Sequence, residues 1–313
     1  MTPSISVVVL SYNRADDLRA NLESLLGATV PQLLEVIVVD NASTDGSPEM
    51  LASLARRDER LTVIANERNL GVAAGRNAGY SAARGEYVVT LDDDSSIPAG
   101  DLARVPEWFS SHPEAGILAF RVVHARTRRP ENDHGIECRP VANFHGAGHA
   151  FRAEVFERVG LLDEICSFGG EEIDMSIRAF DAGYPTVYEP GMMVEHNSLV
   201  REGGDSRRRR SLWLYNYVRV LYKHFPPHLA RRFSRRIIAS LVVSGVARHG
   251  LPFAPVLLES ATRGRRDGMD EHRPVGEATC RFYSDPRLRP DFGNVSLRAK
   301  LAARLGLAQA GSL

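Results

Sequence analysis

Residues 87–94 read YVVTLDDD, a run of aromatic and aliphatic residues that ends in three consecutive carboxylates. A continuous run rich in β-branched residues is typical of a strand that is buried on both faces. Three carboxylates side by side at the end of such a strand repel one another, so something positively charged must offset that repulsion. A divalent cation with oxygen ligands would do so. The alternative is an acidic turn or helix cap, since aspartate is common in both.

Buried-strand patterns of the same kind alternate with helical patterns through the first third of the chain. We predict strands at 5–10, 35–39, 61–65 and 86–91, and helices at 16–26, 47–56, 72–83 and 102–110. Short connections between alternating strands and helices indicate a mostly parallel sheet with right-handed crossovers and helices on both faces. The predicted fold class is therefore α/β and Rossmann-like.

Polar residues gather at the ends of three of these strands. They are residues 11–13 after the first strand, 40–41 after the second and 92–94 after the fourth. In sheets of this type, ligands bind outside the carboxyl ends of the strands. Three polar clusters at three strand ends are hard to explain by packing alone, so we predict a binding site at this edge.

The pattern changes further along the chain. We expect strands at 117–123, 143–151 and 186–188, a polar loop at 126–140 and a helix at 171–182, followed by helices at 211–224, 227–249 and 253–263. A boundary near residues 198–206, in a polar stretch with two glycines, divides the chain into a main domain over 1–200 and a helical region over 201–313. We expect the helical region to contact an acceptor, a membrane surface or a second copy of the chain in a homodimer.

Charge and cysteine content exclude several classes of protein. The 313 residues carry 39 basic and 39 acidic side chains, so overall charge gives no argument for nucleic acid as a partner. Arginines concentrate after residue 200, notably at 207–210 and 231–236, which suits a phosphate-bearing acceptor or an anionic membrane; a solvated helix face is the alternative. The three cysteines are far apart, which argues against a disulfide framework or a cysteine-based zinc site.

The location that we expect is cytoplasmic. The first residues lack the basic region and long apolar stretch of a signal peptide, and the apolar passage at 237–258 is interrupted by Arg248, His249 and Pro252. The amphipathic stretch at 231–238 and the preceding arginines permit peripheral contact with the inner membrane face.

Four motifs, in order and spacing, resemble the signatures of glycosyltransferase family 2, its rhamnosyltransferase-like members included. They are SVVVLSYNR at 6–14, VIVVDNASTDGS at 36–47, NLGVAAGRNAG at 69–79 and LDDD at 91–94. The resemblance extends over about residues 4–198. It implies a catalytic domain of the GT-A fold that binds a nucleoside-diphosphate sugar, with a pyrimidine base as in UDP- or dTDP-sugars, and Mg²⁺ or Mn²⁺ as cofactor.

The resemblance also assigns roles to residues of the donor site. Asp40 matches the aspartate that hydrogen-bonds the base, and Ser11 and Asn13 lie in the loop that lines base and ribose. Arg76 matches a nucleotide or phosphate contact. Asp92 matches the first carboxylate of the family's Asp-X-Asp motif, near the ribose and the metal.

The metal ligands are assigned in the same way. Asp94 matches the second carboxylate of that motif, the direct metal ligand, and Asp93 lies between the two at a position whose role varies; we place it with the donor-binding residues. His196 matches a histidine that completes the metal shell or contacts the diphosphate. His149 lies in a glycine-rich segment that lines the substrate, and we favour it less as a ligand because histidine is not a hard-cation ligand.

A general base is expected in the segment FGGEEID at 168–174. It resembles the family's Glu-Asp-X-Asp segment, whose second acidic residue is the base, and Glu172 stands there in place of aspartate. Glu171 and Asp174 remain alternatives, because acids in the first turn of a helix are also favoured by its dipole. Asp174 is four residues before Arg178, a spacing that predicts a surface ion pair.

These residues predict an inverting transferase, in which Glu172 deprotonates an acceptor hydroxyl and a metal stabilises the leaving diphosphate. The acceptor is a lipid-linked saccharide or polysaccharide, or else a small soluble aglycone. Two alternatives belong to other classes. A nucleotidyltransferase would be expected to open with a glycine-rich phosphate loop, which residues 11–14 lack, and a non-catalytic sugar-nucleotide-binding protein would not need Glu172.

Overall fold

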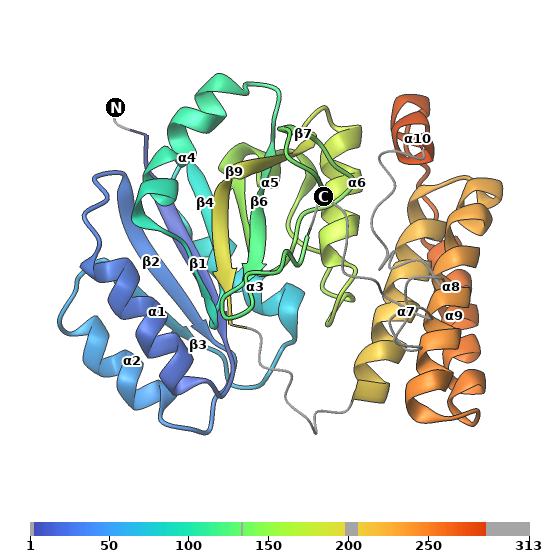
Figure 1. Ribbon diagram of the computed structural model, residues 1–313, viewed down its shortest axis with the longest axis horizontal. Helices are drawn as coiled ribbons and strands as arrows, with labels where there is room; N and C mark the ends of the chain where they lie inside the picture. Colours follow the sequence, from blue (N-terminus) through green and yellow to red (C-terminus); the bar gives the residue numbers. More distant parts are fainter. Residues whose placement is uncertain (1–2, 133, 198–205, 286–313) are drawn as a thin grey trace.

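A computed structural model describes residues 3–132, 134–197 and 206–285 (Figure 1). The first part of the chain forms β1 (Ile5–Ser11), α1 (Ala15–Gly27), β2 (Leu33–Asp40), α2 (Ser47–Ala55), β3 (Leu61–Ala65), α3 (Val72–Ala82), β4 (Tyr87–Asp92), β5 (Ser95–Ser96) and α4 (Ala99–Ser111). It continues with β6 (Ile117–His124), β7 (Arg139–Pro140), β8 (Gly148–Arg152), α5 (Ala153–Val159), α6 (Glu171–Asp181) and β9 (Thr186–His196).

The central sheet has the strand order β3-β2-β1-β4-β8-β6-β9-β5. Strands β3, β2, β1 and β4 are parallel to one another, as is the pair β6 and β9. Strand β8 runs antiparallel between β4 and β6. The α/β fold with a mostly parallel sheet is thus confirmed, and the carboxyl ends of β1, β2, β4 and β9 meet at one edge.

Two hydrophobic cores cover the two faces of this sheet. On β1, Val7 and Val9 contribute to a core with α1, α2 and α4, whereas Val8 between them points into a second core with α3, α5 and α6. Alternation along a strand sends successive side chains to opposite faces. A strand covered by helices on both sides must be apolar at every position, which explains the uninterrupted runs in the sequence.

Strand β9 is much longer than the three residues predicted for it. Pro190 and Gly191 interrupt the strand pattern, yet pairing with β6 resumes beyond them with a register shift between Phe120 and Arg121. The extra length carries the chain to His196 at the binding edge. The strand predicted at 143–151 begins only at Gly148, and part of the expected loop pairs with β9 as the short β7.

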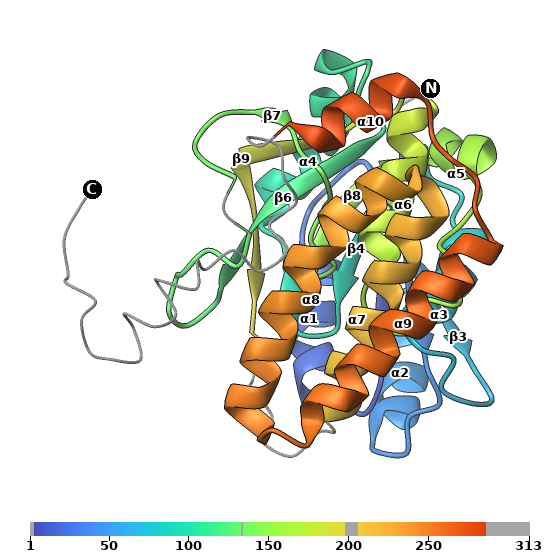
Figure 2. The same ribbon diagram turned by 90° about the vertical axis from the view of Figure 1, so that its right-hand side faces the viewer.

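Helices α7 (Ser206–His224), α8 (Pro227–His249), α9 (Phe253–Asp270) and α10 (Glu277–Ser284) form a bundle beside the sheet (Figures 1 and 2). Glycines allow α9 to lie close to α7: a Cβ at Gly264 would be 2.4 Å from the carbonyl oxygen of Tyr215, and one at Gly268 would be 2.3 Å from that of Arg219. The bundle shares its core with α6 through Ile173.

The boundary predicted near 198–206 lies almost wholly at residues 198–205, outside the described residues. The division into two domains therefore stays a prediction. Among the described residues, no helix is both long enough and apolar enough to span a bilayer.

Candidate donor and metal site

The sheet edge brings together most of the predicted site residues. Ser11 ends β1, Asp40 ends β2, Asp92 ends β4 and His196 ends β9. Asp93 and Asp94 follow in the turn between β4 and β5, which pairs with the end of β9. Residues from four separate parts of the chain thus face one another because their strands are parallel or paired.

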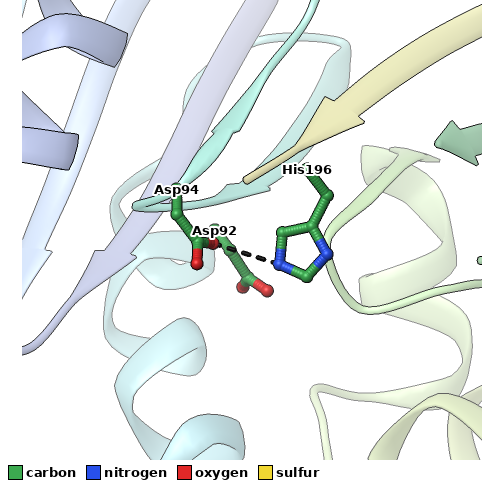
Figure 3. A group of neighbouring side chains, drawn as sticks. All are labelled: Asp92, Asp94 and His196. Carbon is green, nitrogen blue, oxygen red and sulfur yellow. Dashed lines mark ion pairs between the residues drawn. The ribbon is translucent and has the colours of Figure 1, made fainter. Parts of the chain in front are cut away.

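Asp92, Asp94 and His196 form a compact cluster, shown in Figure 3. One potential ligand atom from each lies within 4.8 Å of those of the others. The Nε2 atom of His196 is 3.1 Å from Oδ1 of Asp94. Two carboxylates and an imidazole form a donor set that suits Mn²⁺ and is compatible with Mg²⁺ when further oxygen ligands come from a diphosphate and water. The residues present therefore fit the expected cation.

The second ring nitrogen of His196 is engaged as well. Its Nδ1 lies 2.6 Å from Oε2 of Glu131. Burial alone would lower the pKa of His196, but the hydrogen bonds with Asp94 and Glu131 raise it to about 10. Without a cation the ring is therefore protonated, and a bound cation would replace that proton. A carboxylate behind a ligating histidine is the usual arrangement that fixes the ring's orientation.

Arg14 supplies positive charge to this cluster. Its guanidinium bonds one carboxylate oxygen of Asp94, and its Nε lies 3.6 Å from Asp93. Burial raises the pKa of Asp93 to about 7, and the negative charges of Asp92 and Asp94 add to the effect. Burial opposes ionisation of Asp94 too, yet His196 and Arg14 lower its pKa. With Glu131 counted, four carboxylates lie around three cationic side chains, so the cluster remains short of positive charge.

The family resemblance predicts that the nucleotide base is bound by residues that follow β1 and β2, and these residues form two loops in contact with each other. Asn13 has a positive φ of 54°, and its side-chain oxygen accepts a hydrogen bond of 2.7 Å from the backbone N–H of Thr44. The carboxylate of Asp40, which is buried, accepts one of 3.2 Å from the N–H of Ser43. The Oγ of Ser11 is buried and has no hydrogen-bond partner among the described residues. The loop after β1 is therefore held against the loop after β2.

Arg76 connects the cluster to the acidic residues of α6. Its guanidinium donates to Oδ1 of Asp92 at 2.6 Å and to the carbonyl oxygen of Gly146 at 2.8 Å. On its other side it lies 3.7 Å from Oε1 of Glu171. With only 2% of its surface exposed, this arginine is fixed between the two groups of acids.

Glu171 and Glu172 begin α6 and differ in exposure. Glu171 is buried, and burial together with the charge of Glu172 raises its pKa well above the usual range. Glu172 is partly exposed, and burial raises its pKa less. A Cβ at Gly146 would lie 2.9 Å from Oε1 of Glu172, so the glycine leaves room for that carboxylate. The pair thus has one buried member, Glu171, and one partly exposed member, Glu172, whose carboxyl group lies at the Gly146 turn.

Helix α7 fixes the turn that precedes these glutamates. Asn216, which is fully buried, donates hydrogen bonds to the carbonyl oxygens of Phe168 at 3.1 Å and Gly169 at 2.8 Å. Gly169 and Gly170 adopt φ values of 69° and 97°, which favour glycine. The N–H of Gly170 in turn donates to Oε2 of Glu172 at 3.3 Å. The helical bundle therefore reaches the candidate base through one asparagine.

The prediction that Asp174 forms an ion pair at the surface is wrong, because Asp174 is buried. Asp174 does bond Arg178 at 2.7 Å, but it is fully buried and also contacts Lys223 at 3.1 Å and His224 at 2.7 Å. Although burial opposes ionisation, Arg178, His224 and Lys223 hold the pKa of Asp174 far below its usual range. Two of the partners come from α7, about fifty residues away, which the local spacing could not indicate.

His149 lies away from the cluster. It is buried in β8, with its ring 4.1 Å from that of Phe144, and its Nδ1 is 3.1 Å from the carbonyl oxygen of His145. Burial lowers its pKa well below the usual value. It therefore packs as a neutral core side chain. Arg14, Glu131 and Asn216 are contacts of the site that the sequence did not single out, although Arg14 belongs to the first quoted motif.

Comparison with known proteins agrees with this geometry. The family model described as "Glycosyl transferase family 2" matches residues 6–160, and the model "Glycosyl transferase family group 2" matches residues 87–258. The chain is 40% identical over 108 residues to the succinoglycan biosynthesis protein ExoO of Rhizobium meliloti, covering 34% of this chain and 29% of that protein. It is 34% identical over 200 residues to the uncharacterized glycosyltransferase EpsJ of Bacillus subtilis, covering 58% and 57%. The matches thus cover less than two thirds of either relative.

A solved structure with a similar fold is the mannosyltransferase PcManGT from Pyrobaculum calidifontis in complex with GDP-Man and Mn²⁺. It superposes with a TM-score of 0.60 over 87% of this chain and 84% of that one, at 24% identity, which shows the shared fold. The second family model spans more than half of the sequence, and the four motifs lie on the strands and loops that build the edge described above. The chain belongs to glycosyltransferase family 2.

Proposed function

We propose that this protein is a metal-dependent, inverting glycosyltransferase that moves a sugar from a nucleoside-diphosphate sugar to an acceptor hydroxyl. The observation that carries the proposal is the cluster of Asp92, Asp94 and His196, joined through Arg76 to the acids at the start of α6. A cation-binding cluster alone would fit many enzymes. A cluster linked to a separate, partly exposed carboxylate fits a reaction that needs both leaving-group stabilisation and a base.

The proposed donor site runs along the sheet edge. Asp40 binds the base, while Ser11 and Asn13 line base and ribose. Asp92 and Asp93 lie near the ribose and the diphosphate, and Arg76 adds positive charge there. Asp94 and His196 would hold Mg²⁺ or Mn²⁺, which as a Lewis acid would stabilise the diphosphate as it leaves.

Glu172 is the proposed general base. Its carboxylate takes the proton of the acceptor hydroxyl as the acceptor oxygen bonds to the anomeric carbon and the bond to the diphosphate breaks. One direct displacement inverts the anomeric configuration. The pKa of Glu171 is raised further than that of Glu172, so Glu172 is the member of the pair that ionises more readily. Asp174 is unsuited to this role because it is fully buried and Arg178, Lys223 and His224 occupy its oxygens.

We further propose that the acceptor belongs to cell-surface polysaccharide or glycolipid assembly. The similarity to a succinoglycan biosynthesis protein supports an extended saccharide acceptor over a small soluble aglycone. The three free cysteines suit a reducing compartment, which supports a cytoplasmic location at the inner membrane face. The helical region after residue 200 would meet the acceptor.

The first test is calorimetric titration with UDP-, dTDP- and GDP-sugars, in the presence of Mn²⁺ and then of a chelator. GDP-sugars are included because PcManGT was solved with GDP-Man. We expect one donor to bind, and only with the cation. A folded protein that binds none of the donors under either condition would contradict the donor site and favour another class of function.

The second test separates an enzyme from a binding protein. Glu172→Gln should reduce sugar transfer by about a thousandfold or more while leaving the donor dissociation constant within about twofold, since the base acts only on the acceptor proton. Glu164→Gln, on the loop before α6, serves as the matched control and should retain activity. Full activity in Glu172→Gln would remove this residue from the mechanism. Release of a nucleotidyl product in place of a glycoside would indicate a nucleotidyltransferase.

A further inference from the structure

Residues 206–258 contain no acidic residue, although one residue in eight of the whole chain is acidic. The same stretch carries ten arginines and one lysine. They are Arg207, Arg208, Arg209, Arg210, Arg219, Arg231, Arg232, Arg235, Arg236, Arg248 and Lys223. This stretch forms α7, α8 and the first turns of α9. A run of cations without interspersed acids is expected to face an anionic partner.

Two of these cations are used inside the protein. Arg219 pairs with Asp163 and Glu271, and Lys223 pairs with Asp163 and Asp174. Arg207, Arg209 and Arg248, by contrast, lie on the surface, and among the described residues none forms an ion pair with an acidic side chain. Arg209 lies over the ring of Phe168, with its Cζ 5.3 Å from the ring centroid, and this contact leaves its charge without an acidic partner among the described residues. The charge of the three arginines is therefore available to a partner.

These surface cations gather where α7 begins and α8 ends. The Oγ of Ser206 lies 3.2 Å from Nε2 of His249, which places the two helix ends together. Burial and the charge of Arg248 lower the pKa of Arg210, the mark of like charges held close. Figures 1 and 2 both show the α8–α9 turn and the start of α7 at the lower end of the bundle.

The same end exposes apolar side chains, which we call the apolar tip. The exposed fractions are 78% for Leu251 in the α8–α9 turn, 50% for Val243, 45% for Val256 and 50% for Leu258. All lie within two helical turns of the turn between α8 and α9. At the opposite end of α8, the apolar residues of 231–238 are used in the core, where Ile237 is buried and Phe233 and Ile238 pack against it.

We propose that this end of the bundle, the apolar tip with Arg207, Arg209, Arg210 and Arg248, docks on an anionic lipid membrane. Arginines around exposed aliphatic side chains complement a lipid surface, which offers negative headgroups above an apolar layer. A nucleic acid would use the charge but not the exposed leucines. The membrane is therefore the partner that accounts for both properties.

Other parts of the same chain are poor candidates to cover the tip. Residues 286–313 carry Arg287, Arg289, Arg298, Lys300 and Arg304 against one acid, Asp291. A second copy would bring the same cations face to face. Like charges repel, so neither residues 286–313 nor a second copy of the chain is complementary in charge to the apolar tip and its arginines.

Docking of this kind would orient the active site. In Figure 1 the carboxyl ends of β1 and β9 point towards the lower end of the molecule, where the α8–α9 turn lies, and Figure 2 shows the same direction for β9. The sheet edge would then face the membrane, which presents the site to an acceptor anchored in lipid. This consequence rests on the proposed function, whereas the docking itself does not.

The test is flotation of the full chain with vesicles, without donor or acceptor. We expect binding to an equal mixture of phosphatidylglycerol and phosphatidylcholine, little binding to phosphatidylcholine alone, and release as salt rises from about 0.05 to 0.5 M. The double variant Arg207→Glu/Arg248→Glu should lower the partition coefficient by at least about tenfold, because each cation near such a surface contributes about a factor of five. Leu251→Asp should lower it by a similar factor.

Matched controls carry the same charge changes elsewhere. Arg232→Glu/Arg236→Glu, at the far end of α8, and Leu34→Asp, an exposed leucine on β2, should each change binding by less than about threefold. Equal loss in Arg232→Glu/Arg236→Glu would overturn docking by the tip, and so would equal binding to both vesicle types. Because no sugar transfer is measured, failure here is distinct from failure of the proposed activity.

Discussion

Two groups of carboxylates, one around Asp174 in α6 and one at residues 92–94, differ in how their charge is compensated. Asp174, with Asp163 beside it, is surrounded by Arg178, Lys223 and His224. The three aspartates at 92–94, together with Glu131 beside His196, face Arg14, Arg76 and His196, so four carboxylates meet three cationic side chains. The first group is satisfied by the protein itself. The second keeps an excess of negative charge, which a cation can relieve, and this difference separates a structural cluster from a binding site.

The strongest test of this comparison is Asp174→Asn. Removing the charge leaves Arg178, Lys223 and His224 without the buried carboxylate that they share, and we expect the free energy of unfolding to fall by about 3–5 kcal/mol. Urea denaturation of the metal-free protein measures this change. If Asp174→Asn unfolds at the same urea concentration as the wild type, the cluster around Asp174 does not stabilise the fold.

Asp94→Asn should show the opposite profile. It removes one of several carboxylates that share Arg14 and His196, so the free energy of unfolding of the metal-free protein should fall by less than in Asp174→Asn, by about 1–2 kcal/mol. Metal-dependent donor affinity, measured by calorimetry with Mn²⁺, should fall by at least about a hundredfold, since a direct ligand is lost. A large loss of stability with intact metal binding would reverse the roles assigned to the two groups.

The pH dependence of stability also follows from Asp174. Its pKa is lowered in the folded protein, so its contribution is present above the unfolded-state pKa of about 4 and is lost as pH falls through the folded-state value. The stability difference between wild type and Asp174→Asn should therefore shrink by about 2 kcal/mol or more between pH 5 and pH 2. Unfolding curves over this range check the prediction, and a constant difference would contradict it.

The smallest expected effect is on the turn between the two groups. Asn216→Ala removes both hydrogen bonds to the 168–169 carbonyls, and we expect kcat to fall about tenfold, equivalent to about 1.4 kcal/mol, because Glu172 loses its fixed position. The donor dissociation constant should stay unchanged. In a Glu172→Gln background the substitution should have little further effect on kcat; an equal loss in both backgrounds would show that Asn216 acts elsewhere.

The sequence allowed the parallel sheet and the polar edge to be predicted because both depend on local patterns. Continuous apolar runs mark doubly covered strands, and the carboxyl ends of parallel strands must meet. The length of β9 was missed because Pro190 and Gly191 break the pattern while pairing with β6 continues around them. Local pattern carries no information on a partner strand that tolerates a register shift.

The surroundings of the site could not be predicted for a similar reason. Glu131 reaches His196 from a loop that the sequence shows only as polar, and Asn216 reaches the 168–170 turn from a helix whose asparagine looks like any other. Such contacts depend on how distant segments pack. The roles of the individual site residues remain proposals that the variants above are designed to test.

The hold of Asn216 on the turn before Glu172 has a consequence for engineering. An exchange of the helical region between relatives would naturally place the junction near residue 200, after the end of β9 at His196. A junction there would place the turn at 168–170 against a helix from another protein in the position of α7. That helix would lack the close fit that Asn216 makes with Gly170. Chimeras that instead cross over before residue 160 would transfer the turn, α6 and α7 as one inherited unit.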